Sequence, residues 1–146
     1  MGNAASIGRE LRAHLSKTIS DALRFATMAL RDSTPVDTTN AANNWMITTG
    51  RAYEGVDGSR QDPSHAVQDA LLARMADYDV GRDGKVFIRN NVLYVQYLDD
   101  GWSSQAPPGY VAIVFTNAAE GAPTERRAAV AKMLRSMASH AYHRSL

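Results

Sequence analysis

A long amphipathic helix near the N-terminus constrains the fold more than any other part of the chain. Over residues 7–31, apolar side chains recur every three or four positions and share one broad face at about 100° per residue. The members of this face are Ile7, Leu11, Leu15, Ile19, Ala22, Leu23, Phe25, Ala26 and Leu30. The helix is expected to stop before Pro35, because the residue before a proline avoids helical backbone angles. A face this broad needs a second layer of structure to cover it.

Cationic side chains line one flank of that apolar face. They are Arg9, Lys17, Arg24 and Arg31. Such a flank is typical of a solvated helix edge, but it also suits contact with nucleic acid phosphates. A third interpretation is that it pairs with carboxylates of an adjacent copy of the chain. The sequence alone leaves these three open.

The segments that follow the helix predict a small sheet. Residues 44–49 and 86–89 have the composition of strands, and residues 65–77 predict a short helix between them with Ser64 as its N-cap. An Asn-Asn turn then leads into residues 92–98, which are rich in β-branched and aromatic side chains. We therefore expect the strands at 86–89 and 92–98 to form a hairpin.

The last third of the chain predicts one more strand and a closing helix. Residues 110–116 form an apolar run typical of a strand, and Pro123-Thr124-Glu125 is expected to open the final helix. A chain of 146 residues is about one domain long. The whole chain, residues 1–146, is thus expected to be one α+β domain. It would contain a long N-terminal helix, a small mostly antiparallel sheet with an inserted short helix, and a C-terminal helix.

A turn-rich loop after residue 98 is the strongest candidate for a functional surface. It carries aromatic, serine, glutamine and proline side chains, a composition that suits an active site or a segment ordered against a neighbouring subunit. We favour the subunit contact, with Trp102 as the anchor of the interface. The expected interface residues are Trp102, Ser103, Ser104, Gln105, Pro107 and Tyr110 of the loop, together with Lys17 and Arg24 of the first helix.

Catalytic patterns are incomplete in this chain, so we do not expect an enzyme. The run from Gly101 to Gln105 approaches a nucleophile elbow, but it ends in glutamine where that turn needs glycine. The four histidines all lie on predicted helices, and none is next to this loop in sequence. The serines are therefore interpreted as ordinary turn residues.

Metal, cofactor and membrane partners are not expected either. The absence of cysteine excludes thiolate zinc sites, and the scattered aspartates are typical of turns and helix ends. His140 and His143 have helical spacing without an evident third ligand, and no phosphate-binding glycine loop is present. No apolar run approaches the ~18 residues of a membrane span.

A series of short motifs resembles a family of tailed-bacteriophage neck proteins. The motifs are, in order, Thr34-Pro35-Val36-Asp37-Thr38, then Asn44-Trp45, then Tyr94-Val95-Gln96-Tyr97-Leu98-Asp99-Asp100-Gly101, then Ser104-Gln105-Ala106-Pro107 with Gly109. Their order and spacing resemble the head–tail joining, tail completion or minor tail proteins of the tail protein Z kind. The chain departs from the family pattern at Thr39, where glycine is frequent, and at Leu93, where proline is frequent.

The resemblance implies a structural virion protein that forms a ring at the head–tail junction, between the portal side of the capsid and the tail tube. The implied partners are copies of the chain itself, in a hexamer, together with neighbouring neck and tail proteins. DNA passing through the lumen is a further, non-specific partner. The implied location is the neck or tail of the virion, and the host cytoplasm during assembly. The alternative function is a DNA-binding or nuclease-like module that uses the basic flank.

Overall fold

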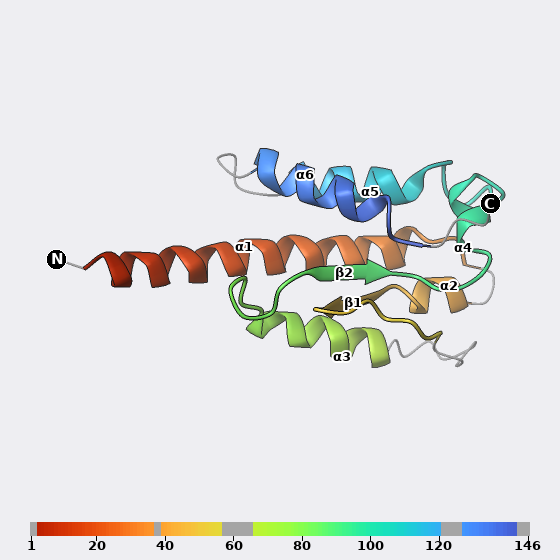
Figure 1. Ribbon diagram of the computed structural model, residues 1–146. Coiled ribbons are helices and arrows are strands. Elements are labelled where there is room, and N and C mark those ends of the chain that lie inside the picture. The colour runs from red at the N-terminus through yellow and green to blue at the C-terminus, as the bar shows by residue number, and fades with distance from the viewer. Residues whose placement is uncertain (1–2, 37–38, 57–65, 121–126, 143–146) are drawn as a thin grey trace.

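The computed structural model describes residues 3–36, 39–56, 66–120 and 127–142. The first helix, α1 (Ala4–Ser33), forms the long axis of the molecule (Figure 1). The side chain of Asn3 caps it by accepting a bond of 2.9 Å from the backbone N–H of Ser6. Thr34, just before the proline, has extended backbone angles and ends the helix. The long N-terminal helix is thus confirmed. None of the described helices is long and apolar enough to cross a membrane.

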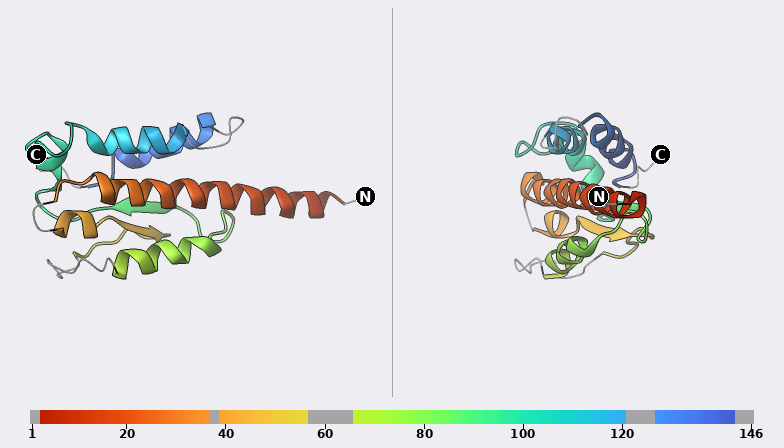
Figure 2. Two further views of the ribbon diagram at one scale, coloured as in Figure 1. Left: turned by 180° about the vertical axis from the view of Figure 1, so that it is seen from behind. Right: turned by 90° about the vertical axis from the view of Figure 1, so that its left-hand side faces the viewer.

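The other elements form layers on opposite sides of α1. Helices α5 (Tyr110–Glu120) and α6 (Arg127–Ala138) cover one side, and a two-stranded sheet lies on the other (Figures 1 and 2). Helix α3 (Ala66–Arg74), extended by the 3₁₀ turn η1 (Met75–Asp77), packs against the outer side of the sheet. Helix α1 is therefore the central layer, and the α+β class is confirmed.

The sheet pairs β1 (Met46–Thr49) with β2 (Val86–Arg89) in antiparallel register, so that Met46 faces Arg89 and Thr49 faces Val86. The short helix α2 (Asn40–Asn43) leads into β1. The predicted hairpin between residues 86–89 and 92–98 is wrong. The second of these segments turns instead into helix α4 (Val95–Asp99), whose buried residues Val95, Gln96 and Asp99 have helical spacing.

The strand predicted at residues 110–116 is also wrong, because this segment is the start of α5. An apolar run of this length does not distinguish a buried strand from a buried helix by its periodicity. Helix α5 is apolar on most of its surface because it contacts both α1 and α6. The final helix is confirmed from Arg127 to Ala138, whereas its predicted opening at Pro123-Thr124-Glu125 lies outside the described residues, as do Asp37 and Thr38.

The core gathers around the C-terminal half of α1. Leu23, Ala26 and Leu30 are fully buried there. They belong to one cluster with Trp45, Ile47 and Ile88 of the sheet side, and with Phe115 and Leu134 of the helical side. This half of the predicted apolar face therefore holds the two outer layers together.

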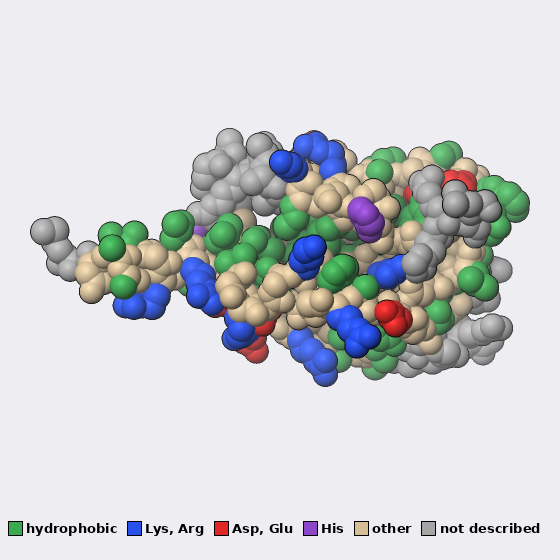
Figure 3. Space-filling model, viewed as in Figure 1, with side chains coloured by type: hydrophobic (Ala, Val, Ile, Leu, Met, Phe, Trp, Pro, Cys, Tyr) green, Lys and Arg blue, Asp and Glu red, His purple; other side chains and the backbone are tan. Residues whose placement is uncertain are grey.

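The N-terminal half of the same face has no such cover. Ile7 is 60% exposed and Leu11 61%, and Leu15 remains partly exposed. Figure 3 shows hydrophobic side chains along this part of α1, where the helix projects beyond the rest of the molecule. Phe25, further along, is also exposed. The described part of the chain thus leaves these four residues of the apolar face without full cover.

The departure from the family pattern at Thr39 coincides with an unusual backbone angle. Thr39 has φ = 59°, in the left-handed region, and its side chain makes no capping bond to α2. This conformation costs a residue with a Cβ atom about 1–2 kcal/mol but is open to glycine.

We expect Thr39→Gly to raise the melting temperature by roughly 2–4 °C, because relief of this strain exceeds the added entropy of the unfolded chain. Thermal unfolding followed by circular dichroism measures the change. Thr39→Ala is the matched control, since alanine keeps the Cβ atom and the strain. A melting temperature lowered by glycine would contradict this interpretation.

Candidate subunit interface

The loop between α4 and α5 is held by its two ends. The backbone N–H of Gly109 donates to the carbonyl oxygen of Asp99 at 2.6 Å, and the buried Asp99 side chain accepts the N–H of Val111 at 2.9 Å. The other carboxylate oxygen of Asp99 accepts the hydroxyl of Tyr142. Asp99 therefore caps α5 and closes the loop at the same point.

Gly101 also fixes the conformation of this loop. Its φ is +93°, and a Cβ atom there would lie 2.7 Å from Cγ of Pro108. Only glycine meets both conditions without a shift of the proline. The segment from Asp99 to Tyr110 is accordingly a closed surface loop packed by its own residues.

Trp102 is presented to solvent by this rigid loop. Its side chain is 77% exposed, and its ring centroid lies 4.8 Å from that of Tyr97 with a tilt of 42°. Its backbone N–H donates to the carbonyl of Tyr97 at 3.0 Å. An exposed tryptophan on a fixed frame can bury a large apolar area on binding and loses little freedom in doing so.

Gln105 joins the loop to the turn after α1. Its side-chain oxygen accepts the N–H of Val36 at 3.0 Å, and its amide nitrogen lies 3.4 Å from the carbonyl oxygen of Val36. These contacts bring Pro35 and Val36 beside the loop that carries Trp102, here called the tryptophan loop, although the two segments lie far apart in sequence.

A groove of about 550 Å³ lies between these segments and will be called the loop groove. Its apolar lining consists of Pro35, Ala41, Tyr94, Leu98 and Trp102, and its polar lining of Thr39, Ser103, Ser104 and Gln105. Leu93, at 91% exposure, and the exposed Val36 lie near it in sequence and add apolar surface at this end of the molecule. Protein–protein contact sites likewise combine apolar and aromatic side chains with polar ones.

Most of the predicted loop residues meet at this groove. Trp102, Ser103, Ser104 and Gln105 line it together, and Pro107 is exposed on the same loop. Tyr110, which was also predicted as an interface residue, does not lie at the surface. It is only 2% exposed and belongs to the core cluster at the start of α5, so its side chain does not lie at an interface.

Tyr110 instead completes a buried hydrogen-bond cluster around Thr34. The Thr34 hydroxyl donates to the carbonyl of Leu30 at 2.6 Å and accepts the indole N–H of Trp45 at 2.8 Å. Because its only proton goes to Leu30, the hydroxyl of Tyr110, 3.3 Å away, is the donor in the third bond. This cluster fixes the turn after α1 against α5.

Burial raises the pKa of Tyr110 to about 12, so its unfolded form ionises at lower pH than its folded form. Its contribution to stability is therefore complete below about pH 10 and is lost as the pH rises toward 12. We expect the difference in unfolding free energy between the wild-type chain and Tyr110→Phe to shrink between pH 9 and pH 12. Urea unfolding at these pH values measures it, and a constant difference would contradict the assignment.

Lys17 and Arg24, the predicted interface residues of α1, do not line the loop groove. Lys17 forms an ion pair of 2.6 Å with Asp21 one turn away, and its side chain is 74% exposed. Arg24 is half-buried, with its Nε atom buried and without a hydrogen-bond partner. Of the other two cations on this flank, Arg31 pairs with Asp32 and Asp69, and Arg9 is exposed.

Sequence reasoning missed the residues that complete the groove. Pro35, Tyr94 and Leu98 belong to the quoted motifs, but two of them were assigned to a strand and none to a surface. The missing signal was tertiary, because bonds between distant residues bring the motifs together, such as those of Gln105 with Val36 and of Thr34 with Tyr110.

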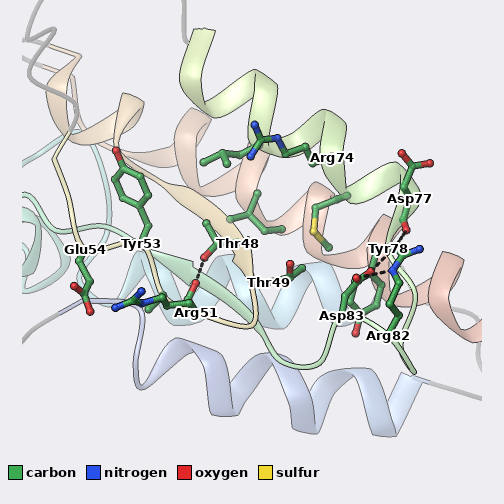
Figure 4. A pocket seen from close by; sticks show the side chains of 14 residues that line it. Thr48, Thr49, Arg51, Tyr53, Glu54, Arg74, Asp77, Tyr78, Arg82 and Asp83 are labelled. Carbon is green, nitrogen blue, oxygen red and sulfur yellow. Dashed lines mark hydrogen bonds and ion pairs between the residues drawn. The ribbon is translucent and has the colours of Figure 1, made fainter.

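A second hollow, of about 490 Å³, lies between β1, α3 and the turn before β2 (Figure 4). Arg82, Asp83 and Asp77 lie together at one end of it, and Arg51, Tyr53 and Glu54 lie at the other. Arg82 donates two bonds of 2.8 Å to Asp83, which lowers the pKa of that carboxyl to about 2. The charges therefore neutralise each other locally and do not converge on one point. Across the described parts of the chain, no three histidine, aspartate or glutamate side chains gather as metal ligands.

Comparisons with protein-family models, with curated proteins and with solved structures find no match to this chain.

Proposed function

We propose that this chain is a structural virion protein of a tailed phage, a ring-forming component of the head–tail junction that joins the portal side of the capsid to the tail tube. The observation that carries the proposal is the exposed Trp102, held on a closed loop beside a groove with apolar and polar walls. A side chain of this kind is typical of the anchor of a protein–protein interface. The proposed role is assembly, which requires no catalytic group.

The motifs behind the family resemblance support this proposal because they contact one another. Thr34 bonds Trp45 and Tyr110, and Val36 bonds Gln105. Motifs that contact one another define one local structure, which here is the closed loop and the groove beside it.

The proposed partners are other copies of the chain, in a hexameric ring, and the adjoining neck and tail proteins. The proposed location is the virion neck, after assembly in the host cytoplasm. The basic flank offers fewer free cations than its sequence suggests, because Lys17 and Arg31 already have carboxylate partners. Because the flank lies directly beside the apolar face of α1, we infer that it serves subunit contacts more than DNA. Charge reversal at Lys17 and Arg24 is expected to impair assembly more than DNA binding.

Complementation of a defective phage tests the proposal. Deletion of the gene from the encoding phage is expected to leave separate heads and tails, and addition of the purified chain is expected to restore infectious particles. Trp102→Ala should restore at least tenfold fewer particles. Val67→Ala, an exposed apolar residue on α3, is the matched control and should restore the wild-type number. Complete infectious particles without the chain would contradict the proposal.

A further inference from the structure

The molecule carries an exposed apolar surface and, at its other end, a groove with partly apolar walls. One is convex and consists of Ile7, Leu11 and Leu15 on the projecting part of α1, here called the α1 stripe. The other is the concave loop groove. Figure 1 shows the N-terminus of α1 at one end of the long axis and α4, which leads into the tryptophan loop, at the other. One molecule therefore cannot bring its own stripe to its own groove.

The stripe also extends far enough to reach a second molecule. Arg12 bonds Asp79, which lies outside the helix, at 2.7 Å. Ser6, closer to the N-terminus, forms its side-chain bond within α1, to Glu10, where the helix projects from the molecule. Residues 4–11 span about 12 Å at the rise of an α-helix. This length is sufficient to place Ile7 and Leu11 in a groove on the surface of a neighbour.

The charges at the two ends are complementary. At the groove end, Asp100 is exposed on the loop of Trp102 and belongs to no ion pair of the described residues, and no lysine or arginine lines the groove. At the stripe end, Arg9 is exposed, whereas Arg12 and Lys17 already pair with Asp79 and Asp21. The first turn of α1 has no acidic side chain, so nothing on the helix offsets the positive end of its dipole. The stripe end is therefore attracted to the groove end of another copy.

We propose that the α1 stripe of one copy docks in the loop groove of a second copy, so that copies join head to tail. The inference rests on the proposed function, because it assigns the surfaces through which the chain would self-associate. Such a contact is heterologous, since each copy contributes a different surface. It leaves one free stripe and one free groove at the ends of any open assembly.

The contact is small, and its test must trap a weak complex. A few side chains bury less than the ~800 Å² per partner of a standard interface. The chain contains no cysteine, which makes single introduced cysteines unambiguous probes. We would prepare Leu11→Cys and Ser104→Cys as separate full-length variants and mix them with a short bis-maleimide cross-linker. Denaturing gels then measure the yield of cross-linked dimer, and peptide mass spectrometry identifies the linked positions.

The expected result is a cross-link between positions 11 and 104 at a yield at least tenfold above that of either variant alone. Val67→Cys in place of Leu11→Cys is the matched control, because Val67 is also exposed and apolar but lies on α3. Adding Trp102→Ala to the Ser104→Cys variant should lower the yield at least fivefold.

Three outcomes would overturn the inference. The first is a dominant product from Leu11→Cys alone, which would indicate that two α1 helices pair. The second is a yield for the Val67→Cys control equal to that of Leu11→Cys. The third is the absence of any cross-link between copies. The chain found in phage necks without the 11–104 cross-link would overturn the inference but leave the proposed function intact. Detection of the 11–104 cross-link for a chain that is absent from phage particles would support the inference and contradict the proposed function.

Discussion

Trp102→Ala is expected to weaken self-assembly by about 30-fold or more while leaving the fold of the isolated chain intact. Truncation of a central interface anchor costs about 2 kcal/mol or more of binding free energy. The same change removes little from the folded monomer, because the side chain is 77% exposed and packs mainly on Tyr97. Analytical ultracentrifugation over a concentration series measures assembly, and thermal unfolding at low concentration measures the fold.

Phe25→Ala is a useful control for this change. Phe25 is an exposed aromatic residue of α1 that belongs neither to the α1 stripe nor to the loop groove. Its replacement should leave assembly within about twofold of the wild-type chain, since exposed side chains outside an interface contribute little. A large fall in melting temperature for Trp102→Ala, with unchanged assembly, would show that Trp102 stabilises the core instead.

Thr34→Val is expected to lower the unfolding free energy by about 3 kcal/mol, which corresponds to a melting temperature roughly 10 °C lower. Valine keeps the shape of threonine but cannot accept a hydrogen bond. The indole N–H of Trp45 and the hydroxyl of Tyr110 would then be left unpaired in the core. Chemical unfolding followed by intrinsic fluorescence measures the loss.

Thr34→Ser distinguishes the hydroxyl from the methyl group. Serine retains the acceptor for Trp45 and Tyr110 and should cost only about 1 kcal/mol, for the lost methyl group. Equal losses for valine and serine would show that packing at this position matters more than the hydrogen-bond cluster.

The helical parts of the fold were predictable where one face is apolar and the other polar. The spacing of Leu23, Ala26 and Leu30 specifies α1, and the proline after Thr34 specifies its end. Periodicity failed for α5, because a helix between two others is apolar on most sides and resembles a buried strand. It failed for α4 because a helix this short carries too few residues to show a period.

In the candidate site, the exposure of Trp102 was predictable, but the other residues that line the groove were not. Trp102 was recognisable because it is a large aromatic residue among turn residues and belongs to no amphipathic helix or strand pattern. Tyr110 was misassigned because the strand prediction separated it from Thr34, its partner in the core. Pro35 and Leu98 are ordinary apolar residues in sequence, and contacts between distant residues, such as the bond between Gln105 and Val36, place them at one groove. Such pairings between distant residues have no local signature.

The central claim is the proposed place of this chain in a phage neck, and electron cryomicroscopy of the neck of the phage that would encode it tests this claim most directly. The proposed function predicts a closed ring of copies in which Trp102 of each copy is buried against the next. A neck that lacks the chain, or a ring in which Trp102 faces solvent in every copy, would contradict it.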